Sequence, residues 1–382
     1  MRLSRSIVGR EEASAVARVI CEDGYLGMGA ETREFEARLA EYLGVEPWQI
    51  VSCNSGTAAL HLAVWAASAH PLRRIPESAA MPEILVPTLT FVSSFQAILA
   101  GGCKPVACDV LPETGTLDLE DAARRLTGNT IAVMHVDYAS NPWHLDAVYA
   151  FGASNGLRVI DDAAHAFGCR HHGRKVGSFG DLVCFSFDGI KNITCGEGGC
   201  LVAFDRESAS IAADARLLGV EGDTARRFAG GRSWQPKVER PGLRYHLSNI
   251  MAAIGNVQLS RLEDEFIPAR RELYNAYVRL LRPERGLKLL ETDPEDYIVP
   301  HIMPVRILDG KKEKVIERLA AAGIPTGIHY KPNHLHPLFG NGREKLANAE
   351  RLYAELVTLP LHPGLDESDV QLVCSALDEA LA

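Results

Sequence analysis

One lysine of this chain lies in a sequence context that suits imine chemistry. Lys191 stands between a predicted strand and the glycine-rich turn at 196–199. A lysine that is confined among apolar residues has a lowered pKa, and its neutral amine can then attack an aldehyde. Most lysines are solvated surface residues, so it is this context that separates Lys191 from the others. The position predicts a reactive amine.

Two adjacent acids, Asp161 and Asp162, close an otherwise apolar run, and His165 follows them. One interpretation is that one acid caps a helix and the other faces solvent, because a buried carboxylate needs a partner. The other interpretation is that a carboxylate holds a buried cationic heterocycle. His165 would then lie one helical turn further on and point the same way.

Two further segments also follow predicted strands. Ser55, Gly56 and Thr57 open a predicted helix, where a serine cap, a close backbone approach and the helix dipole favour a phosphate. The same pattern is often only a helix cap. Phe91 is by default a core aromatic residue, but at this position it could cover a flat ring. Together, the amine, carboxylate, phosphate-binding and stacking groups are the set that pyridoxal phosphate requires.

These groups need a sheet that brings them together. Strands with apolar residues on both faces alternate with helical stretches, which predicts a mostly parallel sheet covered on two sides. In such a sheet, the chemistry gathers at the carboxyl ends of the strands. The strands are predicted at residues 50–54, 83–87, 105–110, 130–136, 157–161, 181–187 and 199–204.

The pattern changes beyond about residue 245. A long helical stretch leads into a tail that alternates a strand at 301–308, a helix at 311–323 and a second strand at 324–330. We therefore expect a large α/β domain at 1–245, and a connecting helix with a small α+β domain at 246–382. The proline-bearing stretch 68–82 is predicted to be an exposed loop.

Composition excludes several classes of protein. The 382 residues carry a formal net charge of −9, with 47% hydrophobic and 23% charged residues. Net acidity gives no reason to expect nucleic acid or an anionic membrane surface as a partner. There is no secretory signal and no apolar span, and nine scattered cysteines suggest reduced thiols. We expect a cytoplasmic protein.

The longer motifs resemble those of the DegT/DnrJ/EryC1/StrS family of aminotransferases. The resemblance covers essentially the whole chain and implies fold-type I, a pyridoxal phosphate cofactor and a homodimer with shared active sites. The motifs that carry it are GTAALHLA (56–63), VPTLTFVSSFQAIL (86–99), VIDDAAHAFG (159–168), SFGDLVCFSFDGIKNITCGEGG (178–199), RYHLSNIMAAIGNVQL (244–259) and GIHYKPNHLHP (327–337).

The resemblance implies a role for each matching residue. Lys191 would be the Schiff-base lysine, Asp162 would bind the pyridine nitrogen, and His165 would bond the phenolic oxygen. Arg244 stands where the family has an asparagine that reaches the phosphate in the neighbouring subunit. The other implied contacts are Phe91 stacked on the ring, Ser55, Gly56, Thr57 and Ser186 at the phosphate, and His329 and Tyr330 near the substrate sugar.

The resemblance also implies a reaction. The expected enzyme aminates a nucleotide-linked keto-deoxy sugar, and we favour a 4-keto-6-deoxyhexose with L-glutamate as the amino donor. Its product would serve a surface polysaccharide, such as lipopolysaccharide O-antigen, or a secondary metabolite. The alternatives are a 3-keto sugar or cyclitol as substrate, and a pyridoxal-phosphate-binding regulator without catalysis. The intact Lys191 argues for amino transfer.

Competing motifs lack support. The string G-x-S-x-G at 152–156 precedes a strand instead of following one, so it does not fit a nucleophile elbow. Neither a dinucleotide-binding fingerprint nor a P-loop occurs. His329, His334 and His336 have no acidic partner at a fixed spacing, so we expect no metal there.

Overall fold

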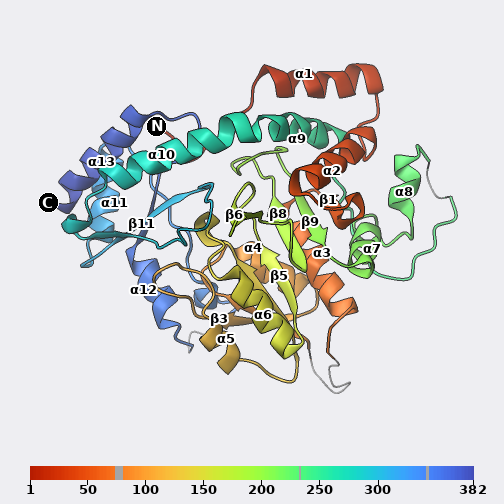
Figure 1. Cartoon of the computed structure of the whole chain (residues 1–382), viewed down its shortest axis with the longest axis horizontal. Coiled ribbons are helices and arrows are strands. Elements are labelled where there is room, and N and C mark those ends of the chain that lie inside the picture. Colours follow the sequence, from red (N-terminus) through yellow and green to blue (C-terminus); the bar gives the residue numbers. More distant parts are fainter. Residues whose placement is uncertain (74–80, 232–233, 341–343) are drawn as a thin grey trace.

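A seven-stranded sheet forms the centre of the molecule (Figure 1). The computed structural model describes residues 1–73, 81–231, 234–340 and 344–382. The strands lie in the order β1-β9-β8-β5-β4-β2-β3, and only β9 runs antiparallel to its neighbours. They are β1 (Ile50–Cys53), β2 (Glu83–Pro87), β3 (Lys104–Cys108), β4 (Thr130–Val136), β5 (Arg158–Asp162), β8 (Leu182–Ser186) and β9 (Gly199–Ala203). The predicted fold class, a mostly parallel α/β sheet, is confirmed.

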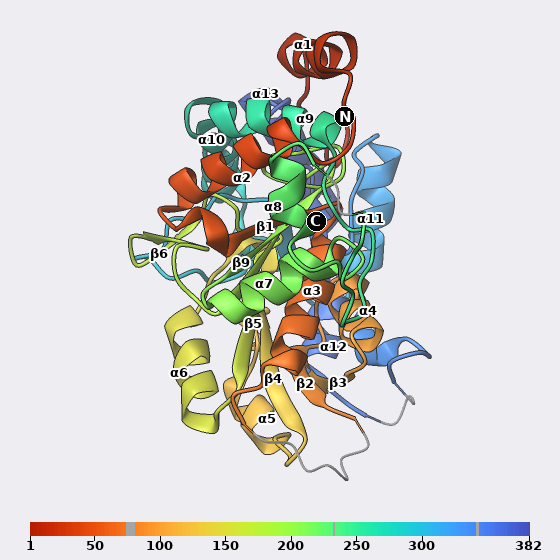
Figure 2. The ribbon, with the colours of Figure 1, turned by 90° about the vertical axis from the view of Figure 1, so that its right-hand side faces the viewer.

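Helices cover both faces of this sheet, which is why its strands are apolar on both sides. Figure 2 shows α6 on one side of the strands and α3 and α4 on the other. One apolar cluster joins the sheet to α3 (Gly56–Ala69), α4 (Val92–Ala100) and α7 (Arg206–Ala215). On the opposite face, two further clusters join it to α2 (Ala30–Leu43), α5 (Leu119–Arg124) and α6 (Leu145–Asn155).

A long helical run connects the large sheet to a smaller one. It consists of α9 (Asn249–Arg261), a π-helical turn (Leu262–Phe266) and α10 (Ile267–Leu280), as the sequence predicts. The smaller sheet is antiparallel, in the order β10-β11-β12, and it packs against α10, α11 and α13. The elements beyond α10 are β10 (Leu287–Leu289), β11 (Met303–Ile307), α11 (Lys312–Ala321), α12 (Ala347–Glu355), β12 (Leu356–Leu359) and α13 (Glu367–Leu381).

Shorter elements complete the described chain. The strands β6 (Arg170–His171) and β7 (Arg174–Lys175) form a hairpin by themselves. No helix in the described ranges is long and apolar enough to cross a membrane. All nine cysteines are free thiols. The remaining elements are α1 (Arg10–Arg18), α8 (Asp223–Phe228), a π-helical turn (Val19–Asp23) and 3-10 turns at Pro47–Gln49, Tyr138–Ser140, Pro283–Arg285 and Asn333–Leu335.

The prediction of a strand at 324–330 is wrong. Only Gly327 pairs there, in an isolated bridge with Thr358, and the third strand of the small sheet is β12. Pro325 has no N–H to donate to a ladder, and the chain then leaves the sheet to line the pocket described below. Residues 74–80 of the predicted loop 68–82 lie outside the described residues. The domain division at residue 245 stays a prediction.

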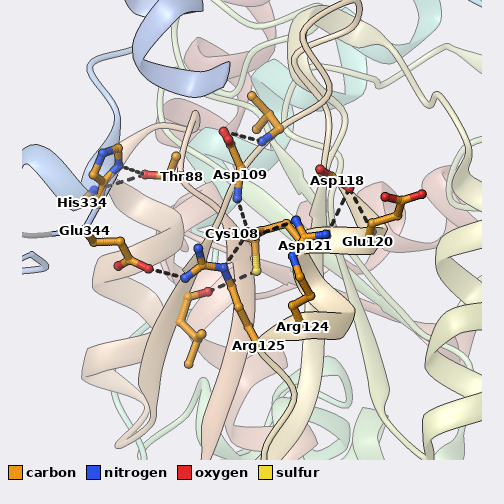
Figure 3. A network of polar contacts seen from close by, with 12 residues as sticks. Thr88, Cys108, Asp109, Asp118, Glu120, Asp121, Arg124, Arg125, His334 and Glu344 are labelled. Atoms are coloured by element: carbon orange, nitrogen blue, oxygen red, sulfur yellow. Dashed lines mark hydrogen bonds and ion pairs between the residues drawn. The ribbon is translucent and has the colours of Figure 1, made fainter. Parts of the chain in front are cut away.

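Polar contacts hold the C-terminal region against the carboxyl ends of β2 and β3 (Figure 3). Asp109, just beyond β3, accepts hydrogen bonds from the N–H groups of Asn348 and Ala349 at 3.0 and 2.9 Å, and so caps α12 from outside. Thr88 Oγ1, just beyond β2, lies 2.9 Å from His334 Nδ1. The segment that contains residues 329–334 is therefore fixed above the sheet edge.

Candidate active site

Ten of the eleven predicted site residues line one pocket of about 380 Å³. It lies at the carboxyl ends of the parallel strands, where a sheet of this kind places its ligand. The residues come from the ends of β1, β2, β5 and β8 and from the segment beyond α11. They are Ser55, Gly56, Thr57, Phe91, Asp162, His165, Ser186, Lys191, His329 and Tyr330.

Lys191 lies in the turn between β8 and β9, where its N–H donates to the carbonyl of Asp188 at 3.1 Å. Its Nζ lies 3.5 Å from His301 Nε2. Burial disfavours the ammonium form and lowers the pKa of Lys191 to about 8, although Asp162 and Asp188 act in the opposite direction. The amine is therefore partly neutral at physiological pH, as the sequence context predicts.

Asp161 and Asp162 are both buried in β5. The interpretation in which one caps a helix and the other faces solvent is therefore wrong. Asp162 accepts a hydrogen bond from Ser94 Oγ at 2.7 Å and a long one from the N–H of Ala164 at 3.4 Å. Burial raises the pKa of the Asp162 carboxyl. A carboxylate has about four acceptor sites, so Asp162 keeps capacity for a cationic partner.

His165 lies in a turn after β5, and not one helical turn beyond Asp162 as expected. The turn still brings both side chains to the pocket. His165 Nε2 lies 3.0 Å from the hydroxyl of Tyr330, and its ring centroid lies 4.5 Å from that of His301. Burial holds the pKa of His165 well below its ordinary value, so the ring is neutral. Its buried Nδ1 has no hydrogen-bond partner among the described residues.

The start of α3 forms a cradle for an anion. Ser55 caps the helix by accepting the N–H of Ala58 at 3.1 Å, and the N–H groups of Gly56 and Thr57, at the start of the helix, have no intrahelical partner. A Cβ on Gly56 would lie 2.7 Å from the Cβ of Ser186. Only glycine therefore allows the helix start to approach Ser186 this closely.

Two aromatic rings lie at the mouth of the pocket. Phe91 precedes α4 and is 54% exposed, so it is not a core residue. Its ring centroid lies 5.6 Å from that of Tyr330. His329 Nδ1 lies 2.8 Å from Thr358 Oγ1, which fixes the orientation of its ring. The exposed face of Phe91 is free to cover a flat ring.

This arrangement fits pyridoxal phosphate. A carboxylate with spare acceptor capacity suits a protonated ring nitrogen, and a glycine-lined helix start suits a phosphate. An exposed aromatic face suits the ring, and a partly neutral lysine suits the aldehyde. The unpartnered Nδ1 of the buried His165 leaves one polar atom for a further contact.

Arg244 is the predicted site residue that the pocket does not contain. Its side chain is exposed, and its carbonyl accepts a hydrogen bond from Asn54 Nδ2 at 3.3 Å. Three residues near Lys191 and Asp162 were not predicted from the sequence, namely Ser94, His301 and Arg270. Arg270 is buried and donates to the carbonyls of Pro300 and His301 at 3.2 and 3.4 Å. Neither the residue type of Arg270 nor its spacing from other residues in the sequence predicts that it lies beside Lys191.

Comparison with known proteins gives a family for the chain. The model of the DegT/DnrJ/EryC1/StrS aminotransferase family matches residues 7–378. The dTDP-4-dehydro-2,3,6-trideoxy-D-glucose 4-aminotransferase of Saccharopolyspora spinosa is 36% identical over 386 aligned positions, which cover 100% of this chain and 97% of that protein.

Solved structures of aminotransferases have the same fold as this chain. The aminotransferase TlmJ from Streptoalloteichus hindustanus has a TM-score of 0.89 and 31% identity, with 100% of this chain and 98% of that chain covered. The PLP form of a putative sugar aminotransferase from Streptococcus pneumoniae has a TM-score of 0.87 at 24% identity, with 100% and 98% covered, and so supports the fold.

The cradle at Gly56 predicts a steric effect. Replacing Gly56 with Ala forces the start of α3 away from Ser186, and we expect pyridoxal phosphate to bind at least about tenfold more weakly. Absorbance titration measures the dissociation constant. Gly128→Ala is the matched control, because a Cβ there meets no atom within 4 Å. Equal affinities in the two variants would contradict the cradle.

The lowered pKa of Lys191 predicts its reactivity. In cofactor-free protein, acylation of Lys191 should reach half of its maximal rate near pH 8, because burial makes the ammonium lose its proton early. Mass spectrometry of the peptides measures the rates, with Lys237 as the internal control, since Glu239 and Glu221 raise its pKa. Asp162→Asn removes a negative charge that favours the ammonium form of Lys191, so it should lower the pH of half-maximal acylation further. If Lys191 and Lys237 reached half of their maximal rates at the same pH, the lowered pKa of Lys191 would be contradicted.

Proposed function

Because the chain belongs to the DegT/DnrJ/EryC1/StrS aminotransferase family, we propose that it transfers the amino group of L-glutamate to a nucleotide-linked 4-keto-6-deoxyhexose. The enzyme is a sugar aminotransferase. One observation carries the amino-transfer chemistry: a partly neutral lysine, a buried carboxylate and a glycine-lined helix start share one pocket with an exposed aromatic ring.

The proposed cofactor is pyridoxal phosphate. When bound, it reacts reversibly with primary amines and withdraws electrons from the carbon that carries the amine. We assign the phosphate to Ser55, Gly56, Thr57 and Ser186, the ring face to Phe91, the ring nitrogen to Asp162 and the phenolic oxygen to His165. Ser94 orients the Asp162 carboxyl through its bond of 2.7 Å.

Lys191 is the proposed base and acid of the reaction. The lowered pKa of about 8 favours the neutral amine, which is the form that can accept a proton from the Cα of the amino donor. The resulting ammonium can return that proton in the next step. The carboxylate of Asp162 would hold the ring nitrogen in its protonated form, which would preserve the electron-withdrawing capacity of the ring.

The choice of sugar rests on the relative from Saccharopolyspora spinosa, a 4-aminotransferase of the dTDP-linked sugar dTDP-4-dehydro-2,3,6-trideoxy-D-glucose. His329 and Tyr330 border the same pocket, and we propose that they contact the sugar. A 3-keto sugar or cyclitol would leave the catalytic residues unchanged. We propose that the amino sugar enters a surface polysaccharide or a secondary metabolite.

We further propose a homodimer with shared active sites. Arg244 lies outside the pocket of its own chain, and its exposed guanidinium could supply a fork of donors to a phosphate in a second copy. This role would explain why a long cationic side chain lies on an exposed segment. That segment is held beside Asn54, whose side-chain amide donates to the carbonyl of Arg244.

A direct assay tests the reaction. Protein loaded with pyridoxal phosphate, L-glutamate and a dTDP-linked 4-keto-6-deoxyhexose should yield 2-oxoglutarate and the amino sugar, at least about tenfold faster than with the 3-keto isomer. Lys191→Ala should lower the rate by about a thousandfold or more, whereas Lys288→Ala, on the surface, should not.

Borohydride reduction separates the enzyme from a binding-only regulator. The wild-type chain should carry a covalent cofactor adduct on Lys191 in mass spectra, and Lys191→Ala should carry none. An adduct without glutamate turnover would favour the regulator. If the wild-type chain gave no adduct and no colour with the cofactor, the assignment of pyridoxal phosphate to this site would be wrong.

Mixed dimers test the shared site. Lys191→Ala and Arg244→Ala chains, unfolded and refolded together, should regain activity, because one of the two sites in the mixed dimer then holds both intact residues. Each variant refolded alone is the control. If Arg244 served its own chain's site, the mixture would show no more activity than the sum of its parts.

A further inference from the structure

A cluster of two histidines and one carboxylate lies outside the pocket. His171 ends β6, His172 follows it in the hairpin turn, and Asp146 lies in the first turn of α6. One donor atom from each of the three lies within 4.8 Å of the others. None of them lines the candidate active site.

The spacing of these atoms suits a tetrahedral metal ion. Asp146 Oδ2 lies 3.4 Å from His171 Nε2 and 3.6 Å from His172 Nδ1. With zinc–ligand bonds of roughly 2.0–2.1 Å at tetrahedral angles, two ligand atoms lie about 3.3–3.4 Å apart. The two separations are therefore close to those of ligands on one ion, and they are long for hydrogen bonds.

His171 presents an unpartnered nitrogen to this cluster. The residue is 1% exposed, and its Nε2 has no hydrogen-bond partner among the described residues. Its Nδ1 lies 2.8 Å from Asp296 Oδ1. Because a carboxylate accepts the Nδ1 hydrogen, the neutral ring keeps a bare lone pair on Nε2, which is the form that binds metals.

His172 repeats the same arrangement. Its Nε2 lies 3.3 Å from Asp293 Oδ2, which leaves Nδ1 on the side of Asp146. Adjacent residues of a strand point to opposite faces, but His172 has a φ of 46°, in the left-handed region. The two rings consequently stack, with centroids 4.0 Å apart and planes inclined by 22°. A metal lies in the plane of each imidazole that binds it, so the partly exposed ring of His172 has to turn when both nitrogens bind one ion beside Asp146.

The local charge favours a cation. Asp146, Asp293 and Asp296 surround the two rings, and Glu295 Oε2 lies 4.0 Å from His172 Nε2. The cation paired with this group among the described residues is Arg174, which binds Oδ1 of Asp146 at 2.7 Å. Oδ2 of Asp146, the oxygen nearer to the histidines, is left for a ligand.

We propose that Asp146, His171 and His172 bind a divalent transition metal ion of the zinc class, with water as the fourth ligand. Imidazole nitrogens select such ions over magnesium and calcium. The ion would join α6, the β6–β7 hairpin and the segment with Asp293 and Asp296. That segment continues through Tyr297, which bonds Arg170 at 2.9 and 2.8 Å, to His301 in the pocket.

The test uses the full chain without an affinity tag, loaded with pyridoxal phosphate and treated with EDTA. Zinc chloride, titrated calorimetrically, should bind at one ion per chain and raise the midpoint of thermal unfolding. His172→Asn and Asp146→Asn should each weaken binding at least tenfold. Asp293→Asn, which removes an outer carboxylate, should weaken it by about tenfold.

His70→Asn is the matched control, since His70 pairs with Glu207 at 3.1 Å on an exposed surface away from the cluster. It should bind zinc like the wild type. Thermal unfolding in EDTA checks that every variant folds. The proposal fails if the wild type binds no zinc, if the cluster variants bind it as well as His70→Asn, or if cobalt gives a thiolate charge-transfer band, which would assign the metal to cysteine.

Discussion

The burial of charged groups at one end of an apolar sheet is the constraint on which this site depends. Asp162 ends β5 and is buried, and Lys191 lies half-buried in the turn that follows the neighbouring parallel strand β8. Desolvation raises the pKa of the acid and lowers that of the amine, and each charge partly offsets the cost of burying the other. Reactivity at Lys191 and charge-binding capacity at Asp162 therefore have one physical origin.

A second constraint is the attachment of the C-terminal region to this edge. Asn333 donates from its side chain to the carbonyls of Thr88 and Thr90 at 3.1 and 2.8 Å, and from its N–H to Thr88 at 2.9 Å. Residues 324–330 form no strand ladder, and the hydrogen bonds of Asn333 hold this segment in place instead. They hold Tyr330 against His165, so a segment remote in sequence closes one side of the pocket. The irregular backbone here is part of the site.

Much of the architecture could be predicted because each strand is an apolar run between polar turns, and the seven predicted strands match the observed ones within a few residues. The site residues could be predicted where they follow a strand, as Lys191, Asp162 and Phe91 do. Ser94, His301 and Arg270 could not, since a serine in a helix, a lone histidine and a helical arginine have many ordinary explanations. The burial of both Asp161 and Asp162 also depended on neighbours that the local pattern does not contain.

By itself, the sequence determined the alternation of strands and helices, the family and the groups that meet at the carboxyl edge, because periodicity and strand ends are local properties of the chain. Only the tertiary structure decided that Phe91 is exposed, that Gly56 touches Ser186 and that two adjacent histidines of the β6–β7 hairpin lie beside an aspartate of α6. Those relations join residues that are far apart in the sequence, such as Gly56 and Ser186, or depend on a left-handed backbone at His172. Distances, burial and pKa shifts arise only when the packed chain removes water from particular pairs of groups.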